Sequence, residues 1–342
     1  MKTRTVIGVS AIAVVLSMAN LFVSHAQQTA SEPAQRPASG APPSSNPLKV
    51  ALLKWYAANE TGITFPVGAG PTGVAFDGAN IWVANYGGNS VTKLRASDGA
   101  LLGTFAVGNA PGGVTFDGAN VWVSNSTSNN VTKLRASDGK NLGTFPVPGV
   151  VPWWMTFDGA NIWVPSSNAK GNGWVTKLRA SDSKNLGNFA VGNSPTAASF
   201  DGANVWVTNG GGSGPGTVTK LRASDGRVLG TFTVGSAPFG IVFDGAYMWV
   251  VNQNDSTISK LRASDGTVVG TFPVPTIPYG VAFDGTNIWV TGTLWVTELR
   301  PSDGSILHRY YSQLYTHNTT GIAFDGANMW AAVYNFNFVD KF

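Results

Sequence analysis

The sequence predicts an all-β fold, a seven-bladed β-propeller whose blades are four-stranded antiparallel sheets. The main observation is the tripeptide Phe-Asp-Gly, which recurs seven times at spacings of 40 to 43 residues. The seven copies begin at Phe76, Phe116, Phe157, Phe200, Phe243, Phe283 and Phe324. A repeat of about 40 residues with four short apolar segments has the size and pattern of one propeller blade.

The first complete repeat, residues 73–111, shows the expected order of elements within a blade. Alternating apolar residues predict strands at 73–76, 81–85, 91–96 and 101–107. The segments Asp77-Gly78-Ala79-Asn80 and Ser97-Asp98-Gly99 have the composition of the turns between strands. The other repeats follow the same order.

The two ends of the array are expected to close the ring. The last repeat has strand segments at 322–324, 329–333 and 339–342, and no fourth segment follows them. Residues 63–68, Ile-Thr-Phe-Pro-Val-Gly, match the outer-strand sequence at 102–108. We therefore predict that an N-terminal strand completes the last blade, because closure removes the open edges of the array.

Three segments are expected before the propeller, which we assign to residues 61–342. Residues 1–26 have the pattern of a secretory signal peptide, with Lys2 and Arg4 before an apolar stretch and a small-x-small site at the end. An uncleaved membrane anchor is the alternative. Residues 27–47, rich in Pro and Ser, are expected to form a disordered spacer.

A short amphipathic helix is predicted at 48–60. Leu48, Leu52, Trp55 and Tyr56 fall at helical spacing, so we expect this helix to pack on the propeller. The alternative is a helix that binds a partner.

Composition limits the classes of partner. Loss of the signal lowers the formal net charge from +4 to +2, and the basic residues are spread over the repeats, so no nucleic-acid partner is expected. The absence of cysteine excludes disulfides and thiolate metal sites. No later stretch is apolar enough to span a membrane. We expect a secreted or periplasmic monomer without a cofactor.

Most of the repeated residues are expected to be structural. A tryptophan occupies the same position in the second strand of each repeat and should pack between blades. These tryptophans are at 82, 122, 163, 206, 249, 289 and 330. Thirteen aspartates lie in the turns, where they can accept backbone N–H bonds. We expect Arg95 to pair with Asp77, and likewise in the other blades. Repeated calcium sites are the alternative, but one carboxylate per turn is few ligands for calcium.

Few residues remain for catalysis. The carboxylates outside the repeated turns are Glu32, Glu60, Asp255, Glu298 and Asp340, and the histidines after the signal are His308 and His317. No spacing typical of a catalytic triad or a metal site is present. We therefore assign no catalytic and no metal-binding residue.

Aromatic side chains are concentrated where loops should surround the mouth of the central channel. The position after the proline that precedes the first strand is Thr72, Gly112, Trp153, Thr196, Phe239 or Tyr279, and the corresponding residue of the last repeat is Thr320, which follows Thr319. Trp154 replaces the glycine that follows in most repeats. The further candidates are Tyr86, Trp174, Trp295, His317, Asn318 and the strand-end asparagines Asn85, Asn125, Asn209 and Asn252.

Such a rim suits a sugar, a peptide or another planar or amphipathic ligand. The partner could thus be a small molecule, a glycan, a peptide or a protein. The alternative is that these aromatic residues plug the channel or pack locally.

The repeat resembles the YVTN-type repeat of the YncE-like bacterial β-propellers. Trp-Val-Ala-Asn at 82–85 and Trp-Val-Thr-Asn at 206–209 stand where that family has Tyr-Val-Thr-Asn. Asn-Ser-Val-Thr-Lys-Leu at 89–94 also fits the pattern, and the resemblance covers about residues 61–342. It implies a propeller fold and a binding role more than a specific activity.

We therefore expect a secreted, non-catalytic binding or scaffold propeller. The alternative is a metal-assisted lyase or lactonase, because the streptogramin (virginiamycin B) lyase propeller is similar in its seven blades and Trp-rich repeats. That resemblance would imply His and Glu groups at the channel mouth. Here the strand ends carry asparagine, and only His317 and Asp255, from different blades, approximate those groups.

Overall fold

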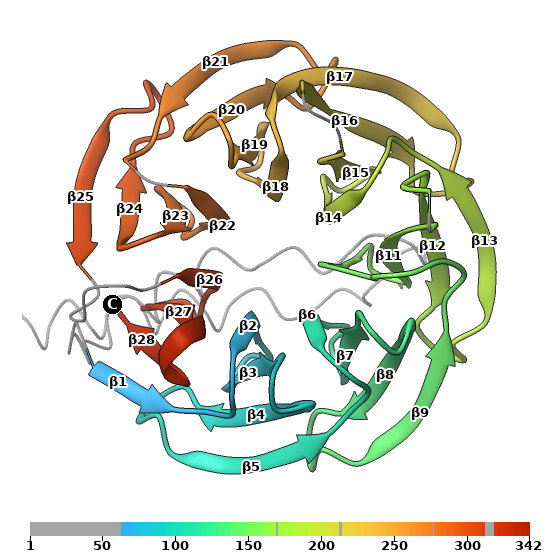
Figure 1. Cartoon of the computed structure of the whole chain (residues 1–342), viewed down its shortest axis with the longest axis vertical. Coiled ribbons are helices and arrows are strands. Elements are labelled where there is room, and N and C mark those ends of the chain that lie inside the picture. The colour runs from blue at the N-terminus through green and yellow to red at the C-terminus, as the bar shows by residue number, and fades with distance from the viewer. Residues whose placement is uncertain (1–62, 169, 212–213, 276, 312–317) are drawn as a thin grey trace, which may run out of the picture. The chain divides into compact units, whose positions relative to one another are not determined.

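The computed structural model describes residues 63–342 except 169, 212–213, 276 and 312–317. These residues form seven antiparallel four-stranded sheets arranged in a ring around a central axis (Figure 1). The predicted fold class is therefore confirmed. The expected signal peptide, spacer and short helix lie outside the described residues. Among the residues described, no helix is long and apolar enough to cross a membrane.

Each blade runs from an inner strand at the channel to an outer strand at the periphery (Figure 1). In blade 1 these are β2 (Pro71–Phe76), β3 (Asn80–Asn85), β4 (Ser90–Arg95) and β5 (Leu101–Ala106). Blade 2 comprises β6 (Pro111–Phe116), β7 (Asn120–Asn125), β8 (Asn130–Arg135) and β9 (Asn141–Pro146); blade 3 comprises β10 (Thr156–Phe157), β11 (Asn161–Ser167), β12 (Gly173–Arg179) and β13 (Asn185–Ala190). Blade 4 comprises β14 (Pro195–Phe200), β15 (Asn204–Asn209), β16 (Pro215–Arg222) and β17 (Val228–Ser236).

The remaining blades follow the same order. Blade 5 comprises β18 (Pro238–Phe243), β19 (Tyr247–Asn252), β20 (Thr257–Arg262) and β21 (Val268–Pro273). Blade 6 comprises β22 (Pro278–Phe283), β23 (Ile288–Gly292), β24 (Trp295–Leu299) and β25 (Ile306–Tyr311). Blade 7 comprises β26 (Thr319–Phe324), β27 (Met329–Val333), the 3-10 helix η1 (Tyr334–Phe336), β28 (Phe338–Lys341) and β1 (Ile63–Pro66).

Closure of the ring by β1 is confirmed. This strand is the outer strand of blade 7 and pairs antiparallel with β28, from Ile63 opposite Lys341 to Pro66 opposite Phe338. The Phe65 ring lies 5.2 Å from the Trp330 ring of the same blade. It also covers Gly99 of blade 1, where an added Cβ would overlap the ring. Residues from the two ends of the array thus share one sheet and contact the next blade.

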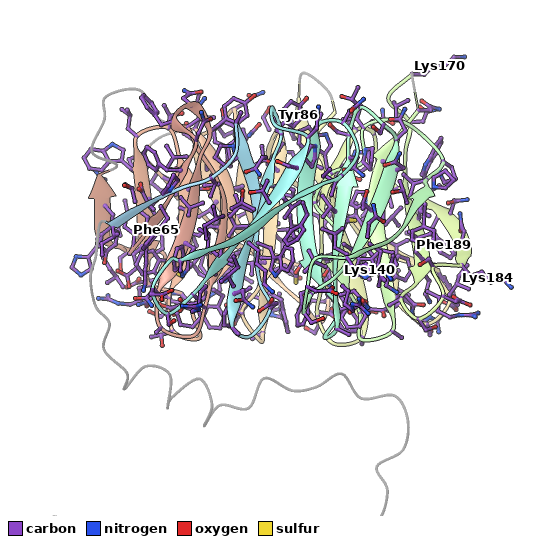
Figure 2. The ribbon with its side chains drawn as sticks, turned by 90° about the horizontal axis from the view of Figure 1, so that it is seen from below. Phe65, Tyr86, Lys140, Lys170, Lys184 and Phe189 are labelled. Atoms are coloured by element: carbon purple, nitrogen blue, oxygen red, sulfur yellow. The ribbon has the colours of Figure 1, made fainter. Side chains whose placement is uncertain are left out.

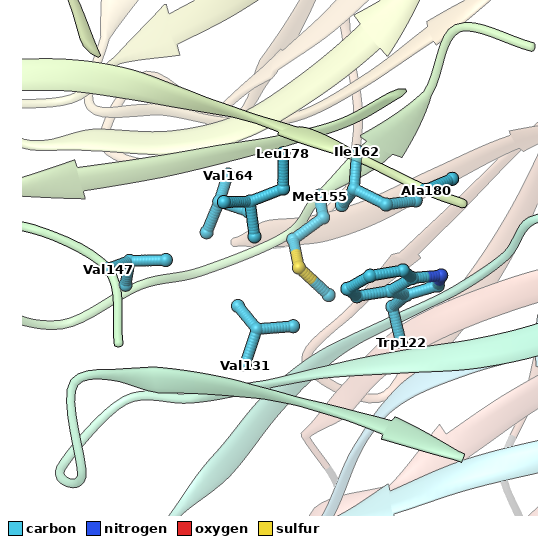
Figure 3. Close-up of a cluster of buried hydrophobic side chains, with 8 residues drawn as sticks. All are labelled: Trp122, Val131, Val147, Met155, Ile162, Val164, Leu178 and Ala180. Carbon is cyan, nitrogen blue, oxygen red and sulfur yellow. The ribbon is translucent and has the colours of Figure 1, made fainter. Parts of the chain in front are cut away.

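The repeated tryptophans pack between blades, as predicted. Six of them are fully buried and Trp289 is 7% exposed. Figure 3 shows the cluster between blades 2 and 3, where Trp122 lies among side chains such as Ile162 and Leu178 of blade 3. Such clusters recur at other blade interfaces, so the core of the protein is divided among the contacts between blades.

The aspartate of each Phe-Asp-Gly turn holds the buried tryptophan of its own blade. Asp77 accepts hydrogen bonds from the backbone N–H groups of Ala79 and Asn80, and its Oδ2 accepts one from Trp82 Nε1 at 2.7 Å. The same indole-to-carboxylate bond occurs in all seven blades. A buried indole N–H therefore always has a partner, which avoids the cost of an unsatisfied donor.

A lysine on the third strand links most blades to the next. Lys93 Nζ lies 5.1 Å from the Trp82 ring centroid and donates to the carbonyl of Ala136 in blade 2 at 2.7 Å. Equivalent bonds are made by Lys133, Lys177, Lys220 and Lys260. These bonds and cation–π contacts satisfy a buried ammonium group.

The repeated arginines pair differently from our expectation. Arg95 contacts Asp98, three residues later, at 2.8 Å, and not Asp77. The same pairing with the turn aspartate three residues later occurs in six blades. The physical reason is local: the arginine ends the third strand directly before the Ser-Asp turn, whereas Asp77 already accepts bonds from the backbone and from Trp82.

The Arg135–Asp138 pair predicts a measurable titration. Hydrogen bonds from the Arg135 guanidinium, then one from the Lys140 N–H, lower the pKa of Asp138 from 3.8 to about 2. Because the folded-state pKa is lowered, this contribution to stability is complete above pH 3.8 and is lost as the pH falls through about 2. In Arg135→Ala, we expect NMR titration to show the Asp138 pKa moving toward 3.8, with Asp98 as an unchanged control. An unaltered Asp138 pKa would contradict this assignment.

Candidate functional site

A cavity of about 270 Å³ opens at the face of the ring that carries the loops between second and third strands, here called the loop face. Tyr86 lies at this face, and Lys140 and Lys184 lie toward the opposite one (Figure 2). The lining residues are Thr72, Tyr86, Trp153, Trp154, Phe239, Tyr279, Asn318, Thr320 and Tyr334. Six of these nine side chains are aromatic, so the cavity wall consists mainly of ring surface.

The repeat brings several of these rings together. Phe239 and Tyr279 are the second residues of β18 and β22, directly after a proline, and Thr72 and Thr320 occupy the same position in β2 and β26. Trp153 also follows a proline, Pro152, in the segment that leads into β10. Equivalent positions of inner strands surround one axis, so side chains far apart in the sequence converge on the channel.

The rings on one side of the cavity are steeply inclined to one another. Phe239 lies at the centre of this group, with its ring centroid 6.0 Å from Trp153 and 5.2 Å from Trp154, at interplanar angles of 66° and 79°. The Phe239 and Tyr279 centroids are 6.1 Å apart at 84°. On the other side, Tyr86 and Tyr334 are 6.4 Å apart at 56°. Edge-to-face contacts of this kind are favourable and keep the rings from collapsing into one stack.

Trp154 lines the cavity and contacts two other blades. Its Nε1 donates to the carbonyl of Gly112 in blade 2 at 3.3 Å, while its ring contacts Phe239 in blade 5. A second cavity of about 130 Å³, lined mainly by glycine and aliphatic residues, lies below and also has Trp154 in its wall. Trp154 thus lines both cavities, whereas the other five rings line only the cavity at the loop face.

The tryptophan at this position changes the inner strand of blade 3. Most blades have glycine there because the inner strands lie very close: a Cβ at Gly73 would be 2.6 Å from the carbonyl oxygen of Gly112. In blade 3 the regular inner strand shrinks to the two residues of β10, and Trp154 forms an isolated parallel bridge with Ala197 of blade 4. The large side chain is thus accommodated by local loss of sheet structure.

The polar groups of the wall are mostly engaged in holding the blades together. Thr72 Oγ1 donates to the carbonyl of Pro111 at 3.0 Å, and Thr320 Oγ1 donates to that of Pro71 at 3.1 Å. The hydroxyl groups of Tyr86, Tyr279 and Tyr334 make no hydrogen bond to a described residue. None of the described lining residues is charged. The wall can therefore offer ring faces and phenol oxygens to a ligand.

Five aromatic candidates chosen from the sequence meet at this cavity, together with Asn318: Tyr86, Trp153, Trp154, Phe239 and Tyr279. Two other aromatic candidates do not line it. Trp174 Nε1 donates to the carbonyl of Pro148 at 2.7 Å, and Trp295 begins β24 in blade 6. His317 lies outside the described residues.

The strand-end asparagines also lie away from the cavity. Asn85, Asn125, Asn209 and Asn252 are at most 2% exposed and are absent from its lining. Asn85 Nδ2 donates to Thr92 Oγ1 at 2.9 Å, and the other three make the equivalent bond to a threonine or serine. Their geometry is that of groups joining the second and third strands.

Tyr334 was missed in the sequence. It is the first residue of η1, between the second and third strands of blade 7, and corresponds to Tyr86 in blade 1. Comparing the residues that directly follow the second strand in each repeat would have found it. The signal was weak because Val333 stands where most repeats have asparagine.

A cluster of side chains that could hold a metal ion is not assembled in the described part of the chain. No cluster of three or more histidine, cysteine, aspartate or glutamate side chains is found there. Asp255, the carboxylate considered for the lyase alternative, accepts a hydrogen bond from the backbone N–H of Ser236 at 2.6 Å and does not line the cavity.

Comparison with known proteins shows similarity in structure only. No family model and no curated protein matches the chain. Virginiamycin B lyase from Staphylococcus aureus is similar, with a TM-score of 0.68 and 19% identity over 82% of this chain and 98% of that one. A catalytically inactive histidine-to-alanine variant of that enzyme with quinupristin has a TM-score of 0.68 and 20% identity, over 82% of this chain and 98% of that one. Kuenenia stuttgartiensis hydrazine synthase has a TM-score of 0.72 and 19% identity, over 84% of this chain and 98% of that one. Likeness at this level of identity establishes the propeller fold.

Proposed function

We propose that this protein is a secreted, non-catalytic binding propeller of the YVTN-repeat, YncE-like type, whose ligand occupies the cavity at the loop face. The observation that carries the proposal is the wall of six aromatic side chains without a charged residue among the described lining. Preformed, mostly apolar concave sites with a few polar groups are the usual binding sites of small ligands.

The proposal includes the organisation inferred from the sequence. Residues 1–26 would direct export and be removed, residues 27–47 would act as a spacer, and 48–60 would form a short helix before the ring. We further propose an extracytoplasmic monomer that needs no cofactor. The resemblance of the repeats to the YVTN pattern supports this assignment, as does the propeller fold.

The size of the cavity limits the ligand. Its volume of about 270 Å³ lies just below the range of about 300–1,000 Å³ typical of drug-sized ligands. The bound part should therefore be one small molecule, one sugar ring or the tip of a longer chain. Burial of that part against several rings supplies contact area at low cost in side-chain entropy, because aromatic side chains have few rotatable bonds.

Substitution of the wall should abolish binding without unfolding the ring. We expect a thermal-shift screen of the protein against glycans, peptides, small organic molecules and divalent metals to identify a stabilising ligand. At 100 times its Kd, such a ligand should raise the free energy of unfolding by about 2.7 kcal/mol. Trp153→Ala and Tyr279→Ala should weaken that ligand at least tenfold.

Trp174→Ala is the matched control, because Trp174 is an aromatic residue at the start of β12 that lies outside the cavity wall. A ligand whose affinity is unchanged in Trp153→Ala and Tyr279→Ala but falls in Trp174→Ala would move the site elsewhere. A screen in which no compound raises the melting temperature would count against a small-molecule role for the cavity.

A metal-assisted lyase remains a second candidate for two reasons. The similar structures include virginiamycin B lyase, one of them with quinupristin, and Asn318 in the cavity wall directly follows His317 in the chain. Incubation with quinupristin and a divalent metal tests this candidate by the appearance of a ring-opened product. Turnover that is lost in His317→Ala and abolished by a chelator would favour the enzyme over the binder.

A further inference from the structure

We propose that the ligand of the aromatic cavity is an organic cation with a quaternary ammonium group, held mainly by cation–π contacts. This inference rests on the proposed function, namely that the cavity binds a ligand, and adds the chemical class of that ligand. Three features of the described residues carry it: the arrangement of the rings, the electrostatics of the wall and the way in which the protein already binds ammonium groups.

The rings enclose the cavity from several directions. Trp153, Trp154, Phe239 and Tyr279 form one side, where the planes of the other three rings are inclined by 66° to 84° to that of Phe239, and Tyr86 with Tyr334 forms the other. Rings inclined in this way present surface to one volume from different directions, whereas a parallel stack would serve only a flat ligand. The face of each ring carries the negative part of its quadrupole and attracts a cation within about 6 Å.

The wall favours a cation over an anion. None of the described lining side chains is positively charged, and Trp154 Nε1, Thr72 Oγ1 and Thr320 Oγ1 already donate to backbone carbonyls. An anion would be left with neutral donors, namely the Trp153 indole N–H and the phenol O–H groups of Tyr86, Tyr279 and Tyr334, which replace its hydration poorly. The phenol oxygens of Tyr86, Tyr279 and Tyr334 add partial negative charge to the ring faces.

The buried lysines show which kind of ammonium group suits the cavity. Elsewhere in the molecule an ammonium lies 4.8 to 5.4 Å from a tryptophan ring centroid in six blades. In five of them the same nitrogen also donates to a carbonyl of the next blade. A primary ammonium therefore uses both ring and carbonyl contacts in this protein, as expected for a group with three N–H donors.

The cavity offers the rings but few free carbonyls. The carbonyls of Pro71, Pro111 and Pro238 at the level of the wall accept bonds from threonine hydroxyls. The phenol oxygens of Tyr86, Tyr279 and Tyr334 are the acceptors left for a primary ammonium. A quaternary ammonium needs no acceptor, because it has no N–H group. The quaternary head group is thus the ligand whose demands match what the wall supplies.

The test compares three ligands by isothermal titration calorimetry on the full-length protein. Choline carries the quaternary group, 3,3-dimethylbutan-1-ol has the same shape without the charge, and ethanolamine has a primary ammonium. We expect choline to bind at least tenfold more tightly than either, which corresponds to about 1.4 kcal/mol. Phe239→Leu, which keeps an apolar side chain but removes the central ring, should weaken choline at least tenfold, and Trp174→Leu should not.

The outcomes separate this inference from the proposed function. Equal binding of choline and its neutral analogue would overturn the cation–π assignment, since burial of apolar surface alone would then explain the affinity. No binding of choline, together with a Trp153-dependent glycan or peptide found in the screen, would also overturn it while leaving the cavity as a binding site. No binding of choline and a flat screen would count against both proposals.

Discussion

Replacing Trp206 by alanine is expected to lower the free energy of unfolding by about 3–5 kcal/mol, the range for a large aromatic side chain removed from a core. Trp206 is 0% exposed and packs against Ile241, Met248 and Val250 of blade 5. The substitution also removes the donor to Asp201 Oδ2 at 2.7 Å and the ring that Lys220 Nζ faces at 4.8 Å. A cavity and two disturbed polar groups would remain at one blade interface.

Guanidinium unfolding curves measure this loss. Two further variants test whether it comes from the buried ring and its N–H group. Leu101→Ala removes a side chain that is 63% exposed, so its free energy of unfolding should change by no more than about 0.5 kcal/mol. Trp206→Phe keeps a ring but loses the N–H, so it should fall between the wild type and Trp206→Ala. If Trp206→Ala were as stable as Leu101→Ala, the interface clusters would not be the main source of stability.

Deleting residues 61–68 is expected to lower the melting temperature of the whole ring in one transition. The deletion removes β1, which supplies four paired residues to β28, and with it the Phe65 ring that contacts Trp330 and covers Gly99. Blade 7 would then expose β28 as an unpaired edge strand, and such edges promote aggregation. The contact between blades 7 and 1 would weaken at the same time.

Differential scanning calorimetry and light scattering measure the two consequences. The control is deletion of residues 27–40, which belong to the expected spacer and should leave the melting temperature unchanged. The milder variant Phe65→Ala keeps the backbone pairing of β1 and should shift the transition less than the deletion does. A melting temperature that is unaffected by loss of residues 61–68 would contradict the role of β1 in closing the ring.

The fold could be predicted because the repeats share the same turn motifs and the same alternation of apolar residues. Phe-Asp-Gly and Ser-Asp turns mark strand ends, and alternation marks the buried faces, so seven copies average out local ambiguity. Ring closure followed from matching residues 63–68 to an outer strand. The aromatic cavity could be predicted in part for the same reason: Trp153, Phe239 and Tyr279 share one position in the repeat, and equivalent positions converge on the axis.

The remaining details depend on which way a side chain turns, and repeat position alone does not determine this. Asn85 ends a strand near the channel mouth, yet its amide turns toward Thr92 on the neighbouring strand. Asp77 and Arg95 lie near one face, but the indole of Trp82 takes the carboxylate that we assigned to the arginine. These choices are settled by short-range competition for hydrogen bonds, which residue spacing does not reveal.

Trp154 also bears on the route by which a ligand enters the cavity. Its side chain reaches from blade 3 to a carbonyl of blade 2 and to the ring of Phe239 in blade 5, and it lines both the aromatic cavity and the smaller one. We therefore expect a ligand to enter from the loop face. A small head group could then be held inside while the larger molecule that carries it stays in solvent above that face.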